Sequence, residues 1–300
     1  MVPSESRGLL FALAAVTTFS MMDGVSKHLA SEYNAPFVIM IRYHVFTVFV
    51  LLLAMRQQGG VRASFRTRHP VLQWLRGGLL GLVTMIGILL FAEFGLAETH
   101  AIFASAPLIV AALSMPLLGE QVGWRRWSAI VVGFIGVLII LQPGATEINN
   151  WVFVAMGMAV AFSFYSILTR LVSRDDDAWT SFFYTAIGGT VVVSLIGPFY
   201  WVEISLADWG WMAALCILST GGHYLLIRAI DEAPPVIVQP MAYLQTVLAS
   251  AIGITIYNEE LRTTTVIGAA IVISAGVFII WREHQRTRAK LRDARVHTAE

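Results

Sequence analysis

The sequence predicts an all-α integral membrane protein with ten transmembrane helices, arranged as two inverted five-helix repeats. Three observations support this prediction. The 300-residue chain is 57% hydrophobic and 13% charged, whereas soluble domains carry about 25% charged residues. Apolar segments of about 20 residues, the length that crosses a bilayer, recur along the chain. One of these segments is repeated 140 positions later.

The repeat relates Glu120–Ile140 to Glu260–Ile280 without a gap. Seven of the 21 positions are identical, including an acidic residue at the start and a Gly-Val pair near the end. A weaker match at an offset of 143 relates the first apolar segment to the sixth. Internal similarity at a constant spacing indicates a duplicated structural unit.

Ten apolar segments of spanning length follow one another. Charged residues, glycines and prolines gather in the short connections between them, and the longest connection, Arg56–Pro70, is also the most basic. We therefore expect spanning helices over 8–30, 36–55, 71–92, 96–118, 124–142, 151–172, 179–198, 209–228, 235–257 and 262–281.

The basic residues predict the orientation, because Lys and Arg accumulate on the cytoplasmic side of a membrane protein. With the N-terminus inside, 17 of the 20 basic residues fall on the cytoplasmic side. The exceptions are Lys27, Arg42 and Arg262. An even number of helices then places both termini in the cytoplasm.

A five-helix unit crosses the membrane an odd number of times, so two successive copies enter it from opposite sides. The sequence thus predicts a first five-helix repeat over 1–145, an inverted second repeat over 146–282 and a basic cytoplasmic tail over 283–300. Inverted repeats are typical of secondary transporters, whose two halves rock around a central site.

The sequence lacks the residue patterns that several other functions require. A net charge of +1 gives no electrostatic footprint for nucleic acid, and the single cysteine, Cys216, has no partner for a disulfide. The phosphate-binding pattern GxxxxGK[ST] and the zinc-binding pattern HExxH are both missing from the sequence. We expect no cofactor and no metal.

The main cluster of carboxylates is Asp175–Asp177, in a predicted cytoplasmic connection. It raises an alternative function, an integral membrane enzyme acting on lipid or isoprenoid substrates. A prenyl-transfer site needs a second aspartate motif to hold Mg²⁺, and the sequence has none. A solvated loop is the simpler interpretation. The inverted repeat also argues against a receptor or scaffold that transports nothing.

Several phrases of the sequence resemble one known family. The first predicted helix ends in DGVSKHLA, the second opens with PFVIMIRY, and the fourth closes with APLIVAALSMPLLGE. The last two helices run as PMAYLQTVLASAIGITIYNEELRTTTVIGAAIVISAGVFIIWRE. Over nearly its whole length the chain resembles the EamA-type members of the drug/metabolite transporter superfamily, and among these the amino-acid and metabolite exporters of the YddG type.

The resemblance implies a secondary transporter rather than an enzyme. Such a protein would export amino acids, aromatic or other neutral ones among them, or related small metabolites by alternating access. It would lie in the bacterial inner membrane, with lipid around it and a small molecule as its substrate. We expect a monomer and no nucleic-acid partner.

Charged residues within spanning helices are the first candidates for a functional site, because burying a charge in a membrane is costly. Asp23 and Lys27 lie four residues apart, hence on one face of the first helix. They would either neutralise each other near the outer interface, or Asp23 would bind a substrate amine or a proton.

Two further candidates lie on the second predicted helix. Arg42 would bind a substrate carboxylate or, in the interpretation that we favour, pair structurally with Asp23 or Glu93. His44 titrates near neutral pH and would either sense protons or make a hydrogen bond between helices.

Polar residues on three later helices complete the predicted substrate site. Gln239 and Tyr243 are four residues apart and would face one cavity. For each tyrosine and glutamine of the set, a hydrogen bond between helices is the interpretation that we favour. For His223 the alternative is a packing role. The candidates are Tyr165, His223, Gln239, Tyr243 and Gln245.

Overall fold

The computed structural model describes residues 3–119, 123–142, 149–233, 238 and 241–297. Within these ranges the chain is helical and contains no strand. In the same ranges, eight helices are long and apolar enough to cross a membrane. The predicted all-α class is therefore confirmed, and the eight candidate spans fit a multi-pass membrane protein.

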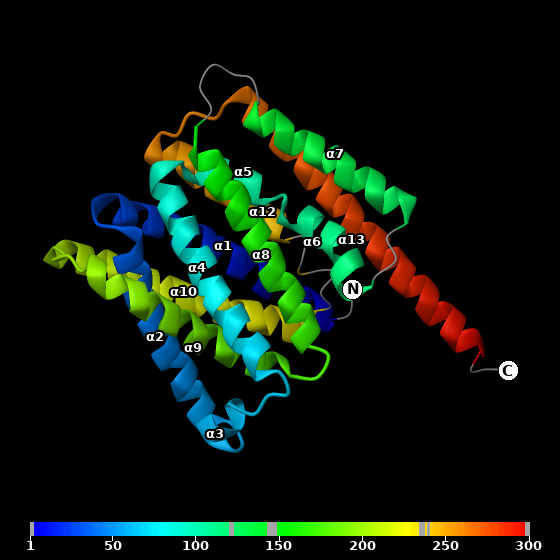
Figure 1. Ribbon diagram of the computed structural model, residues 1–300, viewed down its shortest axis with the longest axis horizontal. Helices are drawn as coiled ribbons and strands as arrows, with labels where there is room; N and C mark the ends of the chain where they lie inside the picture. The colour runs from blue at the N-terminus through cyan, green and yellow to red at the C-terminus, as the bar shows by residue number, and fades with distance from the viewer. Residues whose placement is uncertain (1–2, 120–122, 143–148, 234–237, 239–240, 298–300) are drawn as a thin grey trace.

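The helices follow one another with short connections (Figure 1). Their bounds are α1 (Pro3–Glu32), α2 (Ala35–Arg56), α3 (Gly60–Ser64), α4 (Pro70–Glu93), α5 (Leu96–Phe103), α6 (Ala106–Leu118), α7 (Trp124–Leu141), α8 (Trp151–Val172), α9 (Ala178–Ile196), the 3-10 helix η1 (Gly197–Tyr200), α10 (Leu206–Glu232), α12 (Met241–Tyr257) and α13 (Thr263–His297).

The eight candidate spans coincide with eight of the predicted segments. Two shorter apolar helices, Trp127–Leu141 and Met241–Tyr257, fall on the predicted segments 124–142 and 235–257. The spans are Ser6–Glu32, Ala35–Arg56, Pro70–Glu93, Leu96–Leu118, Trp151–Val172, Ala178–Tyr200, Leu206–Ile230 and Thr263–Arg282.

The predicted segment 96–118 forms one span that is interrupted by a tight turn. α5 ends at Phe103, and α6 begins at Ala106. Pro107 has no N–H to donate to the carbonyl one turn earlier, so the regular hydrogen-bond pattern cannot continue through this point. The break separates a short α5, which carries the buried His100, from the apolar α6.

Polar caps fix where several helices start. The Asn34 side chain accepts a hydrogen bond from the Phe37 N–H at 2.9 Å and caps α2. Asp177 caps α9 in the same way, through the Thr180 N–H at 2.6 Å. Ser205 starts α10 three residues before the predicted segment, because its side chain accepts from the Asp208 N–H.

Three helix pairs form the frame of the bundle. α1 packs along α10, and α4 packs against both α8 and α9. A fourth pair, α7 and α13, lies side by side along one flank of the molecule, and α13 continues beyond the bundle to His297 (Figure 1). The backbone of the predicted tail is thus helical as far as His297.

Glycines bring α4 and α9 into backbone contact along what we term the α4–α9 seam, defined by Gly77, Gly81, Gly188 and Gly189. A Cβ atom on Gly188 would lie 3.0 Å from the Gly77 Cα, and one on Gly81 would lie 2.9 Å from the Gly189 Cα. Small residues allow spanning helices to approach this closely. A larger side chain at either position would force the two helices apart.

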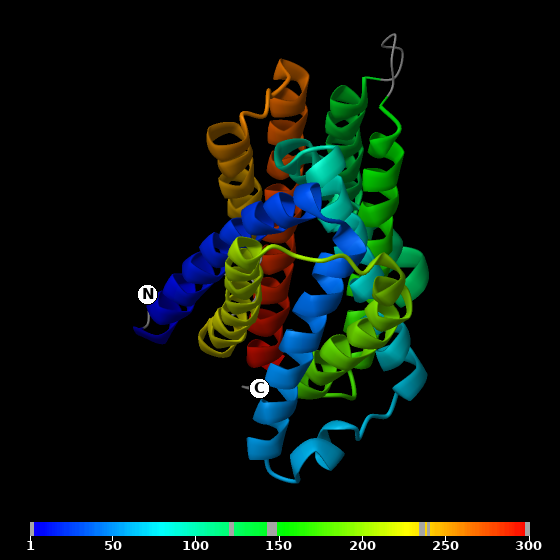
Figure 2. The same ribbon diagram turned by 90° about the vertical axis from the view of Figure 1, so that its left-hand side faces the viewer.

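The bundle has two distinct ends. α3 and the connection from α2 to α4 lie at one end, and the connection from α12 to α13 lies at the other (Figure 2). The polar groups that meet at these two ends, and those that meet between them, form the candidate site.

Candidate functional site

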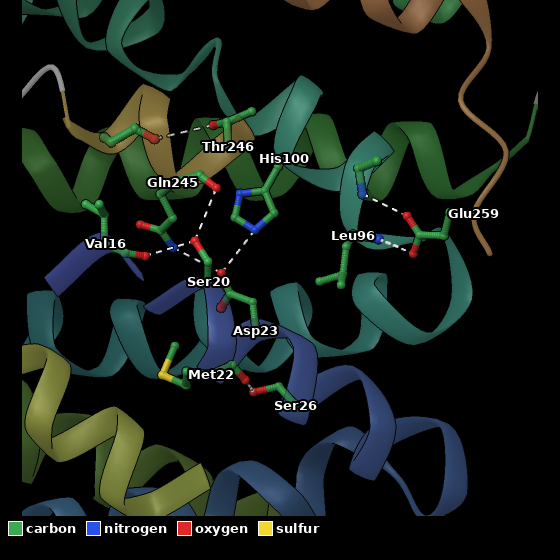
Figure 3. A network of polar contacts seen from close by, with 12 residues as sticks. Val16, Ser20, Met22, Asp23, Ser26, Leu96, His100, Gln245, Thr246 and Glu259 are labelled. Atoms are coloured by element: carbon green, nitrogen blue, oxygen red, sulfur yellow. Dashed lines mark hydrogen bonds and ion pairs between the residues drawn. The ribbon is translucent and has the colours of Figure 1, made fainter. Parts of the chain in front are cut away.

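A buried polar network joins three helices in the interior. The Asp23 carboxylate on α1 lies 3.1 Å from the His100 Nε2 on α5, and it accepts a hydrogen bond from the Gln245 Nε2 on α12 at 3.0 Å. Figure 3 shows the three side chains pointing toward one another. Asp23 is 4% exposed and His100 is 7% exposed. A carboxylate buried this deeply needs such partners.

Neighbouring contacts fix the network in place. The Ser20 hydroxyl, one turn before Asp23, donates to the Val16 carbonyl at 2.8 Å and lies 3.4 Å from the Gln245 carbonyl (Figure 3). The His100 ring stacks on Phe91 with centroids 5.4 Å apart. Asp23 and Gln245 were predicted as site residues. His100 was not, although a titratable residue within a predicted spanning helix is itself a signal.

Arg42 on α2 is buried beside this network and is 5% exposed. Its Nη1 contacts the Met22 Sδ at 3.7 Å, and its guanidinium lies 5.9 Å from the Tyr43 ring. Among the described residues it forms no ion pair, so the predicted structural pairing with Asp23 or Glu93 is absent. Glu93 is exposed at the end of α4.

His223 on α10 lies within a cluster of aromatic rings from three other helices. The ring centroids of Phe19, Phe46 and Phe182 lie 5.1, 4.8 and 6.4 Å from that of His223. The His223 Nδ1 lies 2.7 Å from the Ser219 carbonyl within the same helix. Arg42 is within electrostatic range of both His223 and Asp23. The predicted residues Asp23, Arg42 and His223 therefore lie in one region.

Lys27 pairs with Glu259 and not with Asp23. Its Nζ lies 2.5 Å from the Glu259 Oε1. The Glu259 carboxylate also accepts from the backbone N–H groups of Leu96 at 2.8 Å and Ala97 at 3.0 Å. The predicted neutralising pair of Asp23 and Lys27 is thus not formed. A carboxylate at the N-terminus of α5 attracts the lysine, because it is held there by the helix amides.

We term Lys27, Glu259 and the Leu96 and Ala97 amides the Glu259 clamp. Gly95 gives it room: its φ of 101° suits glycine, and a Cβ there would lie 3.2 Å from the Glu259 carboxylate. The clamp joins α1 and α5 to the connection between α12 and α13. The clamp thereby holds segments from the two halves of the sequence in contact at one end of the bundle.

A larger network, which we term the Asp176 network, closes the opposite end. The Asp176 carboxylate accepts hydrogen bonds from the Thr67 hydroxyl, from the Arg68 N–H at 3.0 Å and from the Gln73 Nε2 at 2.9 Å. Although burial opposes the effect, the hydrogen bonds from Thr67, Gln73 and Arg68 lower the pKa of Asp176. The connection from α8 to α9 is thus attached to that from α2 to α4.

Arg76, which is 2% exposed, extends this network into the bundle. Its guanidinium donates to the Gln73 Oε1 at 3.1 Å, to the Thr169 hydroxyl at 3.2 Å and to the Ser181 carbonyl. It also donates to the Tyr165 hydroxyl at 3.4 Å. Tyr165, predicted to bind substrate, therefore belongs to this network and is not a partner of Asp23.

The aspartates of Asp175–Asp177 have separate structural roles. Asp175 lies 2.8 Å from the His69 Nε2, and this hydrogen bond lowers the pKa of Asp175. Asp177 caps α9. The interpretation of a merely solvated loop is incomplete, because Asp175 and Asp176 bind the segment between α2 and α4 and Asp177 caps its own helix. Within the described ranges no group of three potential ligands could hold a metal ion.

Three predicted residues lie elsewhere. Tyr243 is buried against Gly276 of α13 within an apolar cluster, and its hydroxyl has no partner in the described part of the chain. His44 is exposed on the outside of α2 and lies 3.3 Å from the Ser194 hydroxyl, so it connects two helices. Gln239 lies outside the described residues.

Known proteins resemble this chain in sequence and in fold. A model of the EamA-like transporter family matches residues 6–142 and again residues 149–282. The chain belongs to the EamA-like transporter family. A solved crystal structure with 16% identity superposes with a TM-score of 0.59, covering 95% of this chain and 98% of the other, which shows a shared fold.

Several known transporters align with nearly the whole length of this chain. An S-adenosylmethionine uptake transporter of Rickettsia prowazekii is 28% identical, covering 94% of this chain and 95% of its own. A riboflavin transporter of Vibrio cholerae is 26% identical over 94% and 95%. A pseudopaline exporter of Pseudomonas aeruginosa is 25% identical over 89% and 94%. The protein is thus a member of the drug/metabolite transporter superfamily.

Proposed function

We propose that this protein is a secondary transporter that exports amino acids, or metabolites built on them, across the bacterial inner membrane. It works by alternating access between two inverted repeats, 1–145 and 146–282, with ten helices and both termini in the cytoplasm. The two matches of the family model support the division into repeats. The protein acts as a monomer, and its basic tail, 283–300, rests on the inner leaflet.

The observation that carries the proposal is the buried charge between the two closed ends. Asp23 and Arg42 are each at most 5% exposed and are not bonded to each other. Charges within a membrane protein are costly and mark pathways for polar solutes. An amino acid carries one positive and one negative group, and this region offers a partner for each.

The relatives extend the set of substrates to be tested. S-adenosylmethionine, the solute named for the Rickettsia relative, carries an amino acid at one end and a planar base at the other. Riboflavin has a planar ring system but no amino-acid end, so it is the informative contrast. These relatives include both an uptake transporter and an exporter, and the direction of transport therefore needs a test of its own.

Counterflow in proteoliposomes tests the function. Purified protein is reconstituted in vesicles loaded with an unlabelled solute, and uptake of the labelled solute is followed with and without a pH gradient. The solutes are threonine, methionine, phenylalanine, S-adenosylmethionine and riboflavin. We expect exchange of at least one solute with an amino-acid end, and loss of that exchange in Asp23→Asn. Exchange of riboflavin alone would contradict the amino-acid proposal.

The same vesicles test proton coupling, and a cell assay tests the direction of transport. Exchange without a gradient indicates facilitated transport, whereas uptake only under a pH gradient indicates proton coupling. Efflux from cells that overproduce the protein, compared with cells carrying Asp23→Asn, tests export. Net accumulation inside the cells would contradict the export direction and leave the transporter itself standing.

A further inference from the structure

We infer that Asp23, Arg42 and the rings around His223 form one binding site for a zwitterion with an apolar or planar side group. The inference rests on the proposed function and specifies its substrate. Arg42 binds the carboxylate and Asp23 binds the ammonium group. The rings of Phe182 and His223 contact the side group.

Arg42 has hydrogen-bond donors to spare. A guanidinium carries five N–H donors, yet the one hydrogen bond of Arg42 within the described ranges goes to a thioether sulfur, a weak acceptor. The other guanidinium nitrogens of Arg42 have no hydrogen-bond partner among the described residues. They are not among the unpaired atoms that are fully buried, so they keep some solvent-accessible surface. A carboxylate would satisfy two of these donors at once, in the forked geometry that arginine favours.

Asp23 is open in a complementary way. Both hydrogen bonds to its carboxylate reach one oxygen, Oδ2, from His100 and Gln245. The second oxygen, Oδ1, has no partner in the described part of the chain and is not fully enclosed. His100 and Gln245 thus fix the carboxylate and leave one oxygen to accept from an ammonium group.

The aromatic cluster offers apolar surface to a side group. Phe19 and Phe182 lie beside His223 from two other helices, and each of the three residues is only partly buried. Aromatic rings offset or edge-on at about 5 Å favour a further flat ring. Arg42 lies one turn before Phe46 on the same face of α2, which places the charge beside the rings.

The arrangement favours a zwitterion over a simple anion or cation. Asp23 and Arg42 lie within electrostatic range, so an anion bound at Arg42 would be repelled by Asp23. A cation bound at Asp23 would be repelled by Arg42 in the same way. A solute with both charges satisfies both residues and adds no net charge to the buried site.

Competition with matched analogues tests the site. In the counterflow assay, phenylalanine, phenethylamine and 3-phenylpropionate compete against the labelled solute that the protein exchanges. We expect the two analogues, each lacking one charge, to compete roughly 10- to 100-fold more weakly than phenylalanine, the effect of a charged hydrogen bond. S-adenosylmethionine and its decarboxylated form provide a second matched pair.

The Arg42→Gln variant assigns the carboxylate to its partner. It should weaken competition by phenylalanine roughly 10-fold or more. Competition by phenethylamine should not weaken and should improve, because this amine has no carboxylate to bind and is no longer repelled by the Arg42 charge. Arg42→Lys keeps the positive charge but loses the forked pair of donors. Competition by phenylalanine in this variant should fall between that in the wild type and that in Arg42→Gln. His44→Gln, two residues away but exposed, is the matched control and should behave as the wild type. Size-exclusion chromatography checks that each variant is folded.

The outcomes separate the site from the function. Equal competition by phenylalanine and phenethylamine in the wild type overturns the site while transport stands. So does an equal loss for both compounds in a folded Arg42→Gln. If that variant does not fold, the wild-type analogue series and Arg42→Lys decide. Exchange of riboflavin but no amino-acid compound also overturns the site, whereas no exchange of any solute overturns the proposed function itself.

Discussion

The two ends of the bundle are closed by contacts of different kinds. At the Glu259 clamp, one carboxylate binds one lysine and two backbone amides. At the other end, the Asp176 network and Arg76 link two connections and three helices through many hydrogen bonds. The α4–α9 seam adds backbone contact beneath that network.

This difference indicates which end opens more readily. Opening at the clamp requires the Glu259 carboxylate to leave its partners, together with the Arg262–Glu98 ion pair and the Tyr257–Gly24 hydrogen bond. Water can replace these partners at the membrane surface. Opening at the Asp176 network would expose Arg76 and separate two helices that touch through glycine. We therefore expect the clamp to be the end that opens first from this conformation.

The largest expected effect comes from Arg76→Met. The change leaves the Gln73 side chain and the Ser181 carbonyl without their donor in a buried place. We expect it to destabilise the folded protein by roughly 3 kcal/mol, measured by thermal unfolding in detergent. Arg66→Met, an exposed arginine in the neighbouring connection, is the matched control. Equal stability of the two variants would show that the Asp176 network does not hold this end.

Glu259→Gln should open the clamp without unfolding the protein. The neutral amide keeps hydrogen-bonding capacity but loses the charge that attracts Lys27. Ser26, which is 0% exposed and lies between Asp23 and Lys27 on α1, reports access when replaced by cysteine in a Cys216→Ser background. We expect its thiol modification to accelerate roughly 5- to 30-fold, the effect of about 1–2 kcal/mol.

The Asp176→Asn variant is the control for that experiment. It alters the opposite end, so it should leave the modification of Ser26→Cys at the rate of the background protein. Acceleration by Asp176→Asn that matches that by Glu259→Gln would mean that the two ends do not differ as we describe.

A smaller effect is expected from acid. Hydrogen bonds lower the pKa of Asp176 below its ordinary value of 3.8, so its carboxylate contributes stability above that pH. This contribution is lost as the pH falls through the lowered pKa. The thermal stability of the wild type should therefore decline in this range more steeply than that of Asp176→Asn. Glu203→Gln, at an exposed site, should decline as the wild type does.

The sequence predicted the spans better than the partners of their polar residues. The length and composition of an apolar segment largely determine whether it spans, and the eight spans lie where the segments were expected. The turn between α5 and α6 was missed, because Pro107 alone did not distinguish a break from a continuous spanning helix. Partners were harder to predict: a helical spacing shows that Asp23 and Lys27 share a face, but not that Glu259 comes from the other half of the chain to bind Lys27.

Two important residues were missed for related reasons. Arg76 was counted with the cytoplasmic positive charges, yet it is among the largest fully buried side chains in the described structure. His100 lies among apolar residues and has no polar neighbour in the sequence on its face of the helix. Only the packing of α5 against α1 and α12 brings it to Asp23.

The most direct measurement is counterflow by the wild type, Asp23→Asn, Arg42→Gln and His44→Gln in parallel, with labelled methionine, phenylalanine and S-adenosylmethionine. We predict exchange of at least one of these solutes by the wild type and by His44→Gln, its loss in Asp23→Asn, and weaker but measurable exchange in Arg42→Gln. Undiminished exchange in both variants would contradict a path through these charges. No exchange of any of these solutes by the wild type would contradict the proposed substrate class.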